Sequence, residues 1–306
     1  MVKSSVGSNL YTYDAAPTVP PISAKPDQRL LINNQLPGQL LVSTPSSTLT
    51  TMASPTTFIV GLSGLSSTGK TTLSRLLRSL IPSSFILHQD DFYHPDGAIP
   101  LHAGGLQDWD CAGSINWEYL CRVLDSVHEF GALPADLKSL QDDSPVGAEP
   151  EQKLVSPETM RRLKKRLDDN IRADVRVAIL DGFLMLHRDS PVEERMDVKV
   201  LLRVPHETAK QRREARNGYV TIEGFWTDPP GYFDKIVWPN YVDEHKYLFV
   251  DGDVEGRLTS EAEEKRRIHT PESLDASMEE TLEWAVNILI SELKLKLASA
   301  SSPSSL

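Results

Sequence analysis

The stretch Gly64-Leu65-Ser66-Ser67-Thr68-Gly69-Lys70-Thr71 decides the fold class of this chain of 306 residues. It fits the pattern GxxxxGK[ST], in which the glycines let backbone N–H groups converge on phosphate oxygens at a helix N-terminus. Apolar residues 58–60 before it predict a buried strand, and leucines at helical spacing in residues 73–80 predict a helix after it. This context favours a nucleoside triphosphate site over the alternative, a Gly/Ser turn that binds nothing.

Each residue type in this loop has a chemical role toward the triphosphate. Lys70 reaches the β and γ oxygens as a catalytic residue, Thr71 offers its hydroxyl to Mg²⁺, and Thr72 adds a hydroxyl near the α-phosphate. The pattern thus predicts binding of a nucleoside triphosphate but leaves the reaction open. The expected nucleotide-binding residues in the loop are Gly64, Ser66, Ser67, Thr68, Gly69, Lys70, Thr71 and Thr72.

The rest of the apolar pattern alternates between strands and helices. Residues 85–88, 175–180 and 198–204 read as short buried strands, and residues 158–173 and 273–297 as helices. Such alternation predicts an α/β protein with a parallel, doubly wound sheet flanked by helices. Together with the phosphate loop, it indicates a P-loop kinase fold with a small lid.

The domain organisation follows from composition. Residues 1–57 are rich in Ser, Thr and Pro without a core-forming pattern, so we expect a disordered tail, in which Met52 is a candidate second start site. Residues 58–297 form the kinase domain, with a polar surface insertion at 133–157 and a lid at 206–234. A second disordered tail is expected at 298–306.

Charge and cysteine content exclude several classes of protein. The formal net charge of -11 disfavours non-specific binding to nucleic acid or an anionic membrane, so any anion site is local. Two cysteines exclude a disulfide framework, and no apolar run approaches the roughly 18 to 20 residues of a membrane span. We expect a monomer or weak homo-oligomer in the cytoplasm, or also in the nucleus.

Acidic residues follow two of the predicted strands, at the edge where parallel sheets bind ligands. Asp90 and Asp91 come after residues 85–88, and Asp181 after residues 175–180. A helix cap or a turn is the alternative explanation. We expect Asp90 to orient the proton of the acceptor hydroxyl and to help hold Mg²⁺, with Thr71 and Asp181 as further metal residues. Asp91 is a weaker candidate.

A basic helical pattern at residues 206–218 stands out in an acidic chain. The alternative is a solvated helix face, but a kinase must neutralise charge on the transferred phosphoryl group. We expect Arg212 and Arg216 to contact phosphates, Arg212 with a catalytic role, and Arg213 to lie on the acceptor side. The segment 225–234 is interpreted as the return of the lid, and its aromatic residues are as suited to packing that turn as to touching a ligand.

Five stretches taken together resemble nicotinamide riboside kinases, particularly fungal ones. The likeness covers roughly residues 58–256, and that family resembles the uridine kinase group in fold. It implies ATP- and Mg²⁺-dependent phosphorylation of the 5'-hydroxyl of nicotinamide riboside, or also of nicotinic acid riboside, in NAD salvage. The stretches are Gly61 to Thr72, Gln89-Asp90-Asp91-Phe92-Tyr93, Gln107-Asp108-Trp109-Asp110, Asp181-Gly182-Phe183 and Pro229-Pro230-Gly231-Tyr232-Phe233-Asp234.

The acceptor implied by this resemblance is a cationic nucleoside. Its pyridinium ring suits an aromatic face such as Trp109, Phe92 or Tyr93 in a cation–π contact, and Asp110 suits the ribose hydroxyls. Trp109 stands where some members of the family carry Tyr, and Asp181 where some carry Glu. The full set of expected acceptor residues is Asp90, Asp91, Phe92, Tyr93, Trp109, Asp110 and Arg213.

Two other functions fit the same residues. A uridine or cytidine kinase would need hydrogen-bonding partners for a neutral pyrimidine edge, and no such set is obvious. A nucleotide-binding protein without catalysis would show damage to the acid or to the lid, whereas Asp90, Asp181 and the lid arginines are present. The choice between ATP and GTP stays open.

Overall fold

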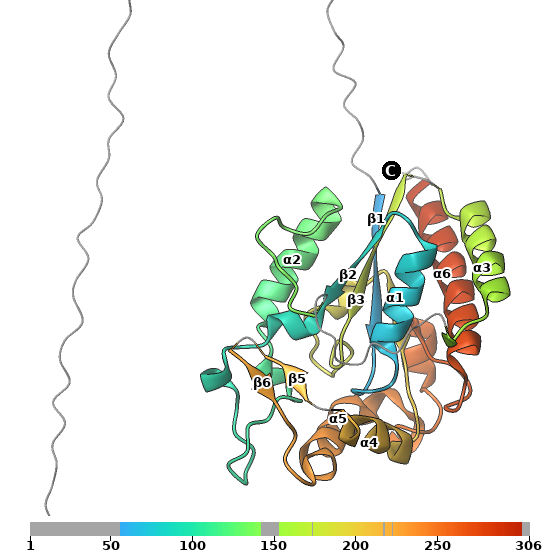
Figure 1. Cartoon of the computed structure of the whole chain (residues 1–306). Helices are drawn as coiled ribbons and strands as arrows, with labels where there is room; N and C mark the ends of the chain where they lie inside the picture. Colours follow the sequence, from blue (N-terminus) through green and yellow to red (C-terminus); the bar gives the residue numbers. More distant parts are fainter. Residues whose placement is uncertain (1–55, 142–152, 173, 217, 222, 302–306) are drawn as a thin grey trace, which may run out of the picture. The chain divides into compact units, whose positions relative to one another are not determined.

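The computed structural model describes residues 56–141, 153–172, 174–216, 218–221 and 223–301 (Figure 1). The expected tail at 1–57 lies outside the described residues, except for Thr56 and Thr57, which begin the first strand. The middle of the expected insertion at 133–157 also lies outside them. At the other end, the last helix extends to Ser301, four residues into the segment expected to be a tail.

The core of the fold is a five-stranded, all-parallel sheet in the order β2-β3-β1-β4-β7. This confirms the predicted α/β class and parallel sheet. β7 was not predicted, because its two residues are too few to show the apolar pattern that identifies a strand. The strands are β1 (Thr56–Ser63), β2 (Ser84–His88), β3 (Val175–Asp181), β4 (Val198–Leu201) and β7 (Ile268–His269).

Helices cover both faces of the sheet, because alternate strand residues point to opposite sides. Phe58 and Val60 face α1 (Lys70–Leu80), α3 (Pro157–Asn170) and α6 (Met278–Ser301), which pack together on one side (Figure 1). Ile59 faces the other side, where α2 (Trp117–Phe130) packs. The phosphate loop therefore leaves the middle strand of a three-layer sandwich.

Local signals set where the helices begin. The Ser156 hydroxyl accepts a hydrogen bond from the Thr159 N–H, so α3 begins with a capped N-terminus at Pro157. α6 begins five residues after the expected start, because Ser277 and Glu280 form a reciprocal capping box there. Apolar spacing alone cannot identify such a boundary.

The described ends of the expected surface insertion make contacts with the rest of the kinase domain. Leu133 and Leu137 pack against the core on the α2 side, and Val155 is buried on the α3 side. The Leu140 N–H donates to a carboxylate oxygen of Asp91 at 2.9 Å. Packed residues therefore extend into the expected insertion from both ends.

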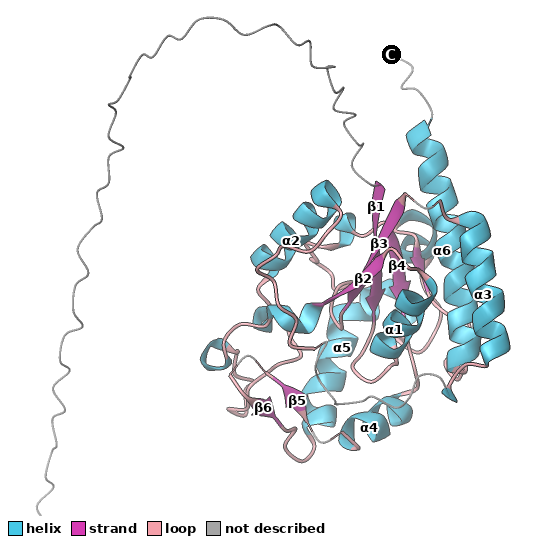
Figure 2. Cartoon of the chain, turned by 45° about the horizontal axis from the view of Figure 1, so that its top comes forward, coloured by secondary structure: helices cyan, strands magenta, loops and turns pink. Residues whose placement is uncertain are grey.

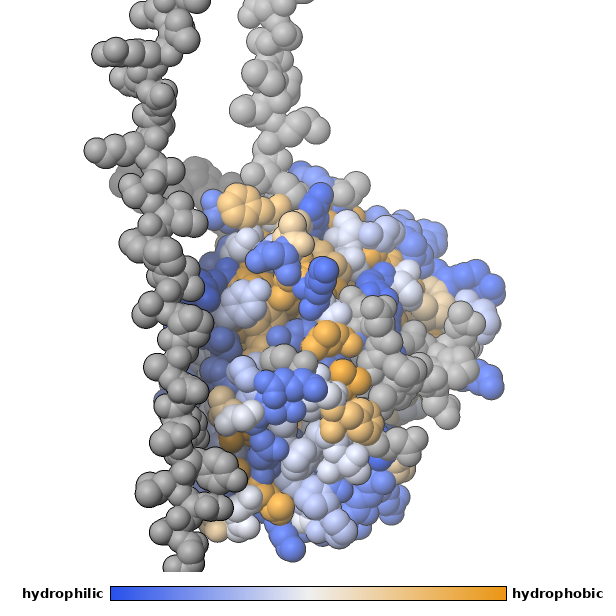
Figure 3. Space-filling model, turned by 60° about the vertical axis from the view of Figure 1, so that its left-hand side comes forward, coloured by the Kyte–Doolittle hydropathy of each residue, from blue (hydrophilic) through white to orange (hydrophobic). Residues whose placement is uncertain are grey.

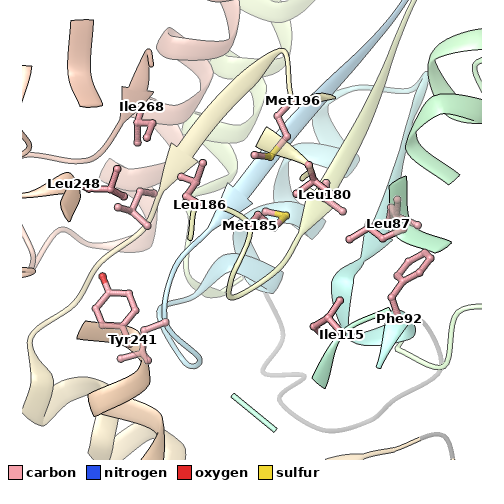
Figure 4. Close-up of a cluster of buried hydrophobic side chains, with 14 of the residues drawn as sticks. Leu87, Phe92, Ile115, Leu180, Met185, Leu186, Met196, Tyr241, Leu248 and Ile268 are labelled. Carbon is pink, nitrogen blue, oxygen red and sulfur yellow. The ribbon is translucent and has the colours of Figure 1, made fainter. Parts of the chain in front are cut away.

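Figure 4 shows part of the buried cluster on the α2 side, with Phe92 beside Leu87 and Ile115. The face of the molecule in Figure 3 carries mostly hydrophilic residues with small hydrophobic groups among them. In the described part of the chain, no helix has the length and apolar character that crossing a bilayer demands.

The predicted lid region forms a helix and a hairpin beyond the carboxyl ends of the strands (Figures 1 and 2). α4 (His206–Glu214) leads into the antiparallel pair β5 (Tyr219–Val220) and β6 (Phe225–Trp226). A π-helical turn over Phe233–Val237 then leads directly into α5 (Trp238–His245), which carries buried Tyr241. This arrangement places α4 and the hairpin at the edge of the sheet where the site lies.

Candidate active site

The phosphate loop adopts a conformation that depends on two glycines. Gly64 has φ 144°, and a Cβ there would lie 2.1 Å from the Leu202 carbonyl oxygen. Gly69 has φ 95° and precedes the first residue of α1. The loop also closes on itself, because Thr68 Oγ1 and Lys70 Nζ both donate to the Leu65 carbonyl at 2.9 Å. The backbone is thus shaped for an anion before any ligand arrives.

Two carboxylates meet at the carboxyl ends of β2 and β3. The sheet register pairs His88 with Asp181, and His88 Nδ1 lies 3.4 Å from Asp181 Oδ2. Burial would raise the pKa of Asp181, but the hydrogen bond from His88 and the charge of Lys70 hold it below its usual value. Burial and the neighbouring charge of Asp181 raise the pKa of Asp90 to about 6. These are two acidic groups with different tasks.

Lys70 lies close to this pair of carboxylates. Burial lowers its pKa to about 8, and the charges of Asp181 and Asp90 oppose that shift. The lysine therefore stays largely cationic near neutral pH. Its charge lies between the phosphate loop and the carboxylates, as the transfer of a phosphoryl group requires.

The residues present fit a magnesium ion. Mg²⁺ prefers oxygen ligands, binds through one or two carboxylates and keeps several waters. Thr71, Asp90 and Asp181 supply such oxygens around one pocket. Burial and the charge of Asp181 both raise the pKa of Asp90, and a bound cation would offset both.

One pocket joins this phosphate side to an acceptor side. On the acceptor side, the Trp109 ring lies 5.3 Å from that of Tyr93, edge to face, and 5.8 Å from that of Trp226. The phosphate side of the lining comprises Ser66, Ser67, Gly69, Lys70, Thr71, Thr72, Asp90 and Asp181. The acceptor side comprises Tyr93, Trp109, Asp110, Arg213, Tyr219 and Trp226.

Arg213 organises the acceptor side. It donates to both carboxylate oxygens of Asp110, at 2.8 and 3.0 Å, and to Asp228 at 2.6 and 3.2 Å. Burial opposes its charge, yet these two carboxylates raise the pKa of Arg213 well above its usual value. Its guanidinium also lies 5.0 Å from the centre of the Tyr219 ring. Arg213 therefore lines the pocket beside Asp110 as a buried clamp, and its predicted role toward an acceptor stays a prediction.

The other two lid arginines differ from each other. Arg216 lines the pocket beside the phosphate loop and stacks at 5.3 Å on the Tyr219 ring. Arg212 is exposed and does not line the pocket, although its Nη1 lies 3.4 Å from the Ser67 carbonyl. The Tyr219 hydroxyl lies 3.4 Å from Ser66 Oγ, so the β5–β6 hairpin touches the phosphate loop directly.

Some predicted residues do not reach the pocket. Phe92 is 1% exposed and packs against Tyr119 in the core, so it cannot offer a face to the acceptor. In the helical turn over Gln89–Phe92, Asp90 points toward the pocket and Phe92 points into the core. Asp91 accepts from Leu140 and lies outside the lining. Gly64 and Thr68 lie outside it too, and shape the loop instead.

Sequence reasoning missed the residues that support the site. Gln89 is fully buried, and its side-chain oxygen accepts from the Phe183 and Leu184 N–H groups, which ties the end of β2 to that of β3. Tyr219 and Trp226 line the pocket. The sequence leaves the aromatic residues of 225–234 equally suited to packing the turn and to touching a ligand, because their spacing alone does not separate a ligand contact from a core contact.

Several proteins similar in sequence to this chain are nicotinamide riboside kinases. A nicotinamide riboside kinase from Schizosaccharomyces pombe is 35% identical over 78% of this chain and 98% of the relative. One from Saccharomyces cerevisiae is 36% identical over 68% of this chain and 85% of the relative. Human nicotinamide riboside kinase 2 is 32% identical over 60% of this chain and 65% of the relative. No family model matches the chain.

Proposed function

This chain belongs to the nicotinamide riboside kinase family, and we propose that it transfers the γ-phosphoryl group of ATP to the 5'-hydroxyl of nicotinamide riboside. One observation supports this most: a single pocket holds the phosphate loop, a carboxylate pair and an aromatic acceptor side. The product would be nicotinamide mononucleotide, which links the reaction to NAD salvage.

The acceptor side suits a cationic nucleoside. Trp109, with Tyr93 against its ring, offers an aromatic wall to a pyridinium ring, in a contact worth about 0.5 to 2 kcal/mol. Asp110, fixed by Arg213, offers carboxylate oxygens to the ribose hydroxyls. Together these contacts would direct the 5'-hydroxyl toward the end of the phosphate loop.

The chemical step needs a proton acceptor beside that hydroxyl. Asp90 lies between the acceptor side and the phosphate loop and carries a carboxylate able to take the proton. As the hydroxyl oxygen bonds to the γ-phosphorus, the bond to the leaving ADP oxygen breaks and the proton passes to Asp90. Orienting the hydroxyl in line with that bond is the main contribution of the carboxylate.

Charge on the moving phosphoryl group is neutralised from two directions. Lys70 follows the β and γ oxygens, and Arg216 approaches from α4 and its following turn. Thr71 and Asp181, with Asp90, would hold Mg²⁺, which when bound neutralises charge on the β and γ oxygens. His88 hydrogen-bonds to Asp181 and keeps its carboxylate ionised for that purpose.

The test is an acceptor panel. Purified protein with MgATP is assayed on nicotinamide riboside, nicotinic acid riboside, uridine and cytidine, and kcat/KM ranks them. We expect the two pyridine ribosides to lead by at least about tenfold. A lead for uridine or cytidine would show a pyrimidine nucleoside kinase, and absence of transfer to every acceptor would show a nucleotide-binding protein without this chemistry. Repeating the assay with GTP, and with EDTA in place of Mg²⁺, tests the donor and the metal.

A further inference from the structure

We propose that Tyr232 and Asn240 are positioning residues that set the affinity for the acceptor, although neither lines the pocket. They act through residues Gln107 to Asp110, here called the acceptor loop. This inference rests on the proposed function, because it assigns the acceptor loop to nucleoside binding. Tyr232 directly precedes the π-helical turn Phe233–Val237, and Asn240 lies in the following helix α5; the turn sits on the core rather than on the pocket.

The Tyr232 hydroxyl closes the acceptor loop from behind. It accepts a hydrogen bond from the Trp109 backbone N–H at 3.0 Å and donates one to the Gln107 carbonyl at 2.9 Å. The tyrosine is 1% exposed and packed in the core. A single buried hydroxyl thus satisfies both a donor and an acceptor of the backbone that presents Trp109 to the pocket.

Asn240 holds the same loop at a second point. Its Nδ2 donates to both carboxylate oxygens of Asp108, at 2.8 and 2.9 Å. Asp108 is buried, and its Oδ1 also accepts from the Asp110 N–H at 3.1 Å. In the described part of the chain no lysine or arginine forms an ion pair with Asp108. The amide of Asn240 therefore fixes a carboxylate that in turn fixes the backbone of Asp110.

The contacts from Tyr232 and Asn240 together define the orientation of Trp109 and Asp110. Trp109 and Asp110 are held through their backbone N–H groups, and the Asp110 side chain is held separately by Arg213. Binding sites lose affinity when side chains of the right type are left loosely oriented. Loosening the acceptor loop should thus weaken the acceptor while leaving the phosphate loop, which closes on its own residues, unchanged.

The experiment compares Tyr232→Phe with a matched control, Tyr241→Phe. Both tyrosines are buried in adjacent elements, but among the described residues the Tyr241 hydroxyl has no hydrogen bond to the acceptor loop. We expect Tyr232→Phe to raise the acceptor KM about tenfold, with the ATP KM within about twofold of wild type, since two buried backbone groups lose their partner. Tyr241→Phe should leave both values unchanged. Direct titration with nicotinamide riboside should reproduce the shift.

Asn240→Ala provides a second, independent variant, and we expect the same selective rise in acceptor KM. The proposal is overturned if Tyr232→Phe leaves acceptor affinity unchanged, or if the KM values for acceptor and ATP rise together, as a general loosening of the whole pocket would cause. Thermal unfolding of each variant shows whether a change in KM accompanies a loss of stability. If wild-type protein phosphorylates no riboside, the proposed function fails first and this inference fails with it. Active wild type with an unaffected Tyr232→Phe variant overturns this inference alone.

Discussion

The two sides of the pocket differ in the range of the contacts that shape them, although Tyr219 and Arg212 also reach the phosphate loop from far along the chain. On the phosphate side, Lys70 and Thr68 hydrogen-bond to Leu65, five and three residues away. On the acceptor side, Asp110 pairs with Arg213 across 103 residues, and Trp109 with Tyr232 across 123. A local loop can be recognised in the sequence and responds to changes in a few adjacent residues. A distributed site depends on the whole fold, so its affinity responds to residues far along the chain.

Asp90 lies where the two sides meet, and its loss should have the largest effect. Asp90→Asn keeps the size but removes the proton acceptor, so we expect kcat to fall by about 10² to 10⁴. Steady-state kinetics with MgATP and nicotinamide riboside measure this. Asp91→Asn is the control, since Asp91 lies outside the pocket lining, and it should change kcat less than about threefold. Equal losses in the two variants would contradict the assignment of Asp90.

Lys70→Ala tests the phosphate side alone. The charge that follows the γ-phosphate is lost, so we expect kcat to fall by about 10² to 10³, in the range for one lost transition-state contact. Titration with nicotinamide riboside in the absence of nucleotide should give the wild-type Kd. Lys138→Ala, an exposed lysine outside the pocket, is the control. Normal turnover of Lys70→Ala at saturating ATP would contradict the phosphate-loop assignment.

Asp110→Asn tests the acceptor side alone. The variant weakens the charged hydrogen bonds to the ribose hydroxyls. Such bonds contribute about 1.5 to 3 kcal/mol to binding, so the acceptor KM should rise by about 10 to 100-fold. The ATP KM should stay within about twofold. Titration with the riboside checks that KM reports binding. If the ATP KM rises in parallel, the two sides of the pocket are coupled and do not act independently.

Trp109→Tyr should give the smallest effect. Both rings can stack against a pyridinium, but tryptophan makes the stronger cation–π contact, so we expect the acceptor KM to rise about two- to fivefold. The ratio of kcat/KM for nicotinamide riboside over uridine measures selectivity. A change of more than about tenfold in that ratio would show that Trp109 selects the base rather than supporting it.

The parts of the molecule that are local in sequence were predictable. The phosphate loop, the strands that flank it and Asp181 at a strand end follow from residue type and spacing, and the sheet confirms the strands. The role of Asp90 stays a prediction for the kinetics above. Phe92 could not be excluded from the pocket, because which way a turn directs successive side chains depends on its geometry. The contacts of Tyr232 and Asn240 could not be predicted, because nothing in the local sequence identifies a partner 125 or 132 residues away.

The strand order also governs how the protein is made. β1 and β2 leave the ribosome first, yet neither pairs with the other, and both wait for β3. The residues between His88 and Val175 take on the order of ten seconds to synthesise. Through that interval the nascent chain carries two apolar strands with open edges, which are templates for association with other chains. We therefore expect the risk of such association to be greatest in the growing chain, before the acceptor side of the pocket exists.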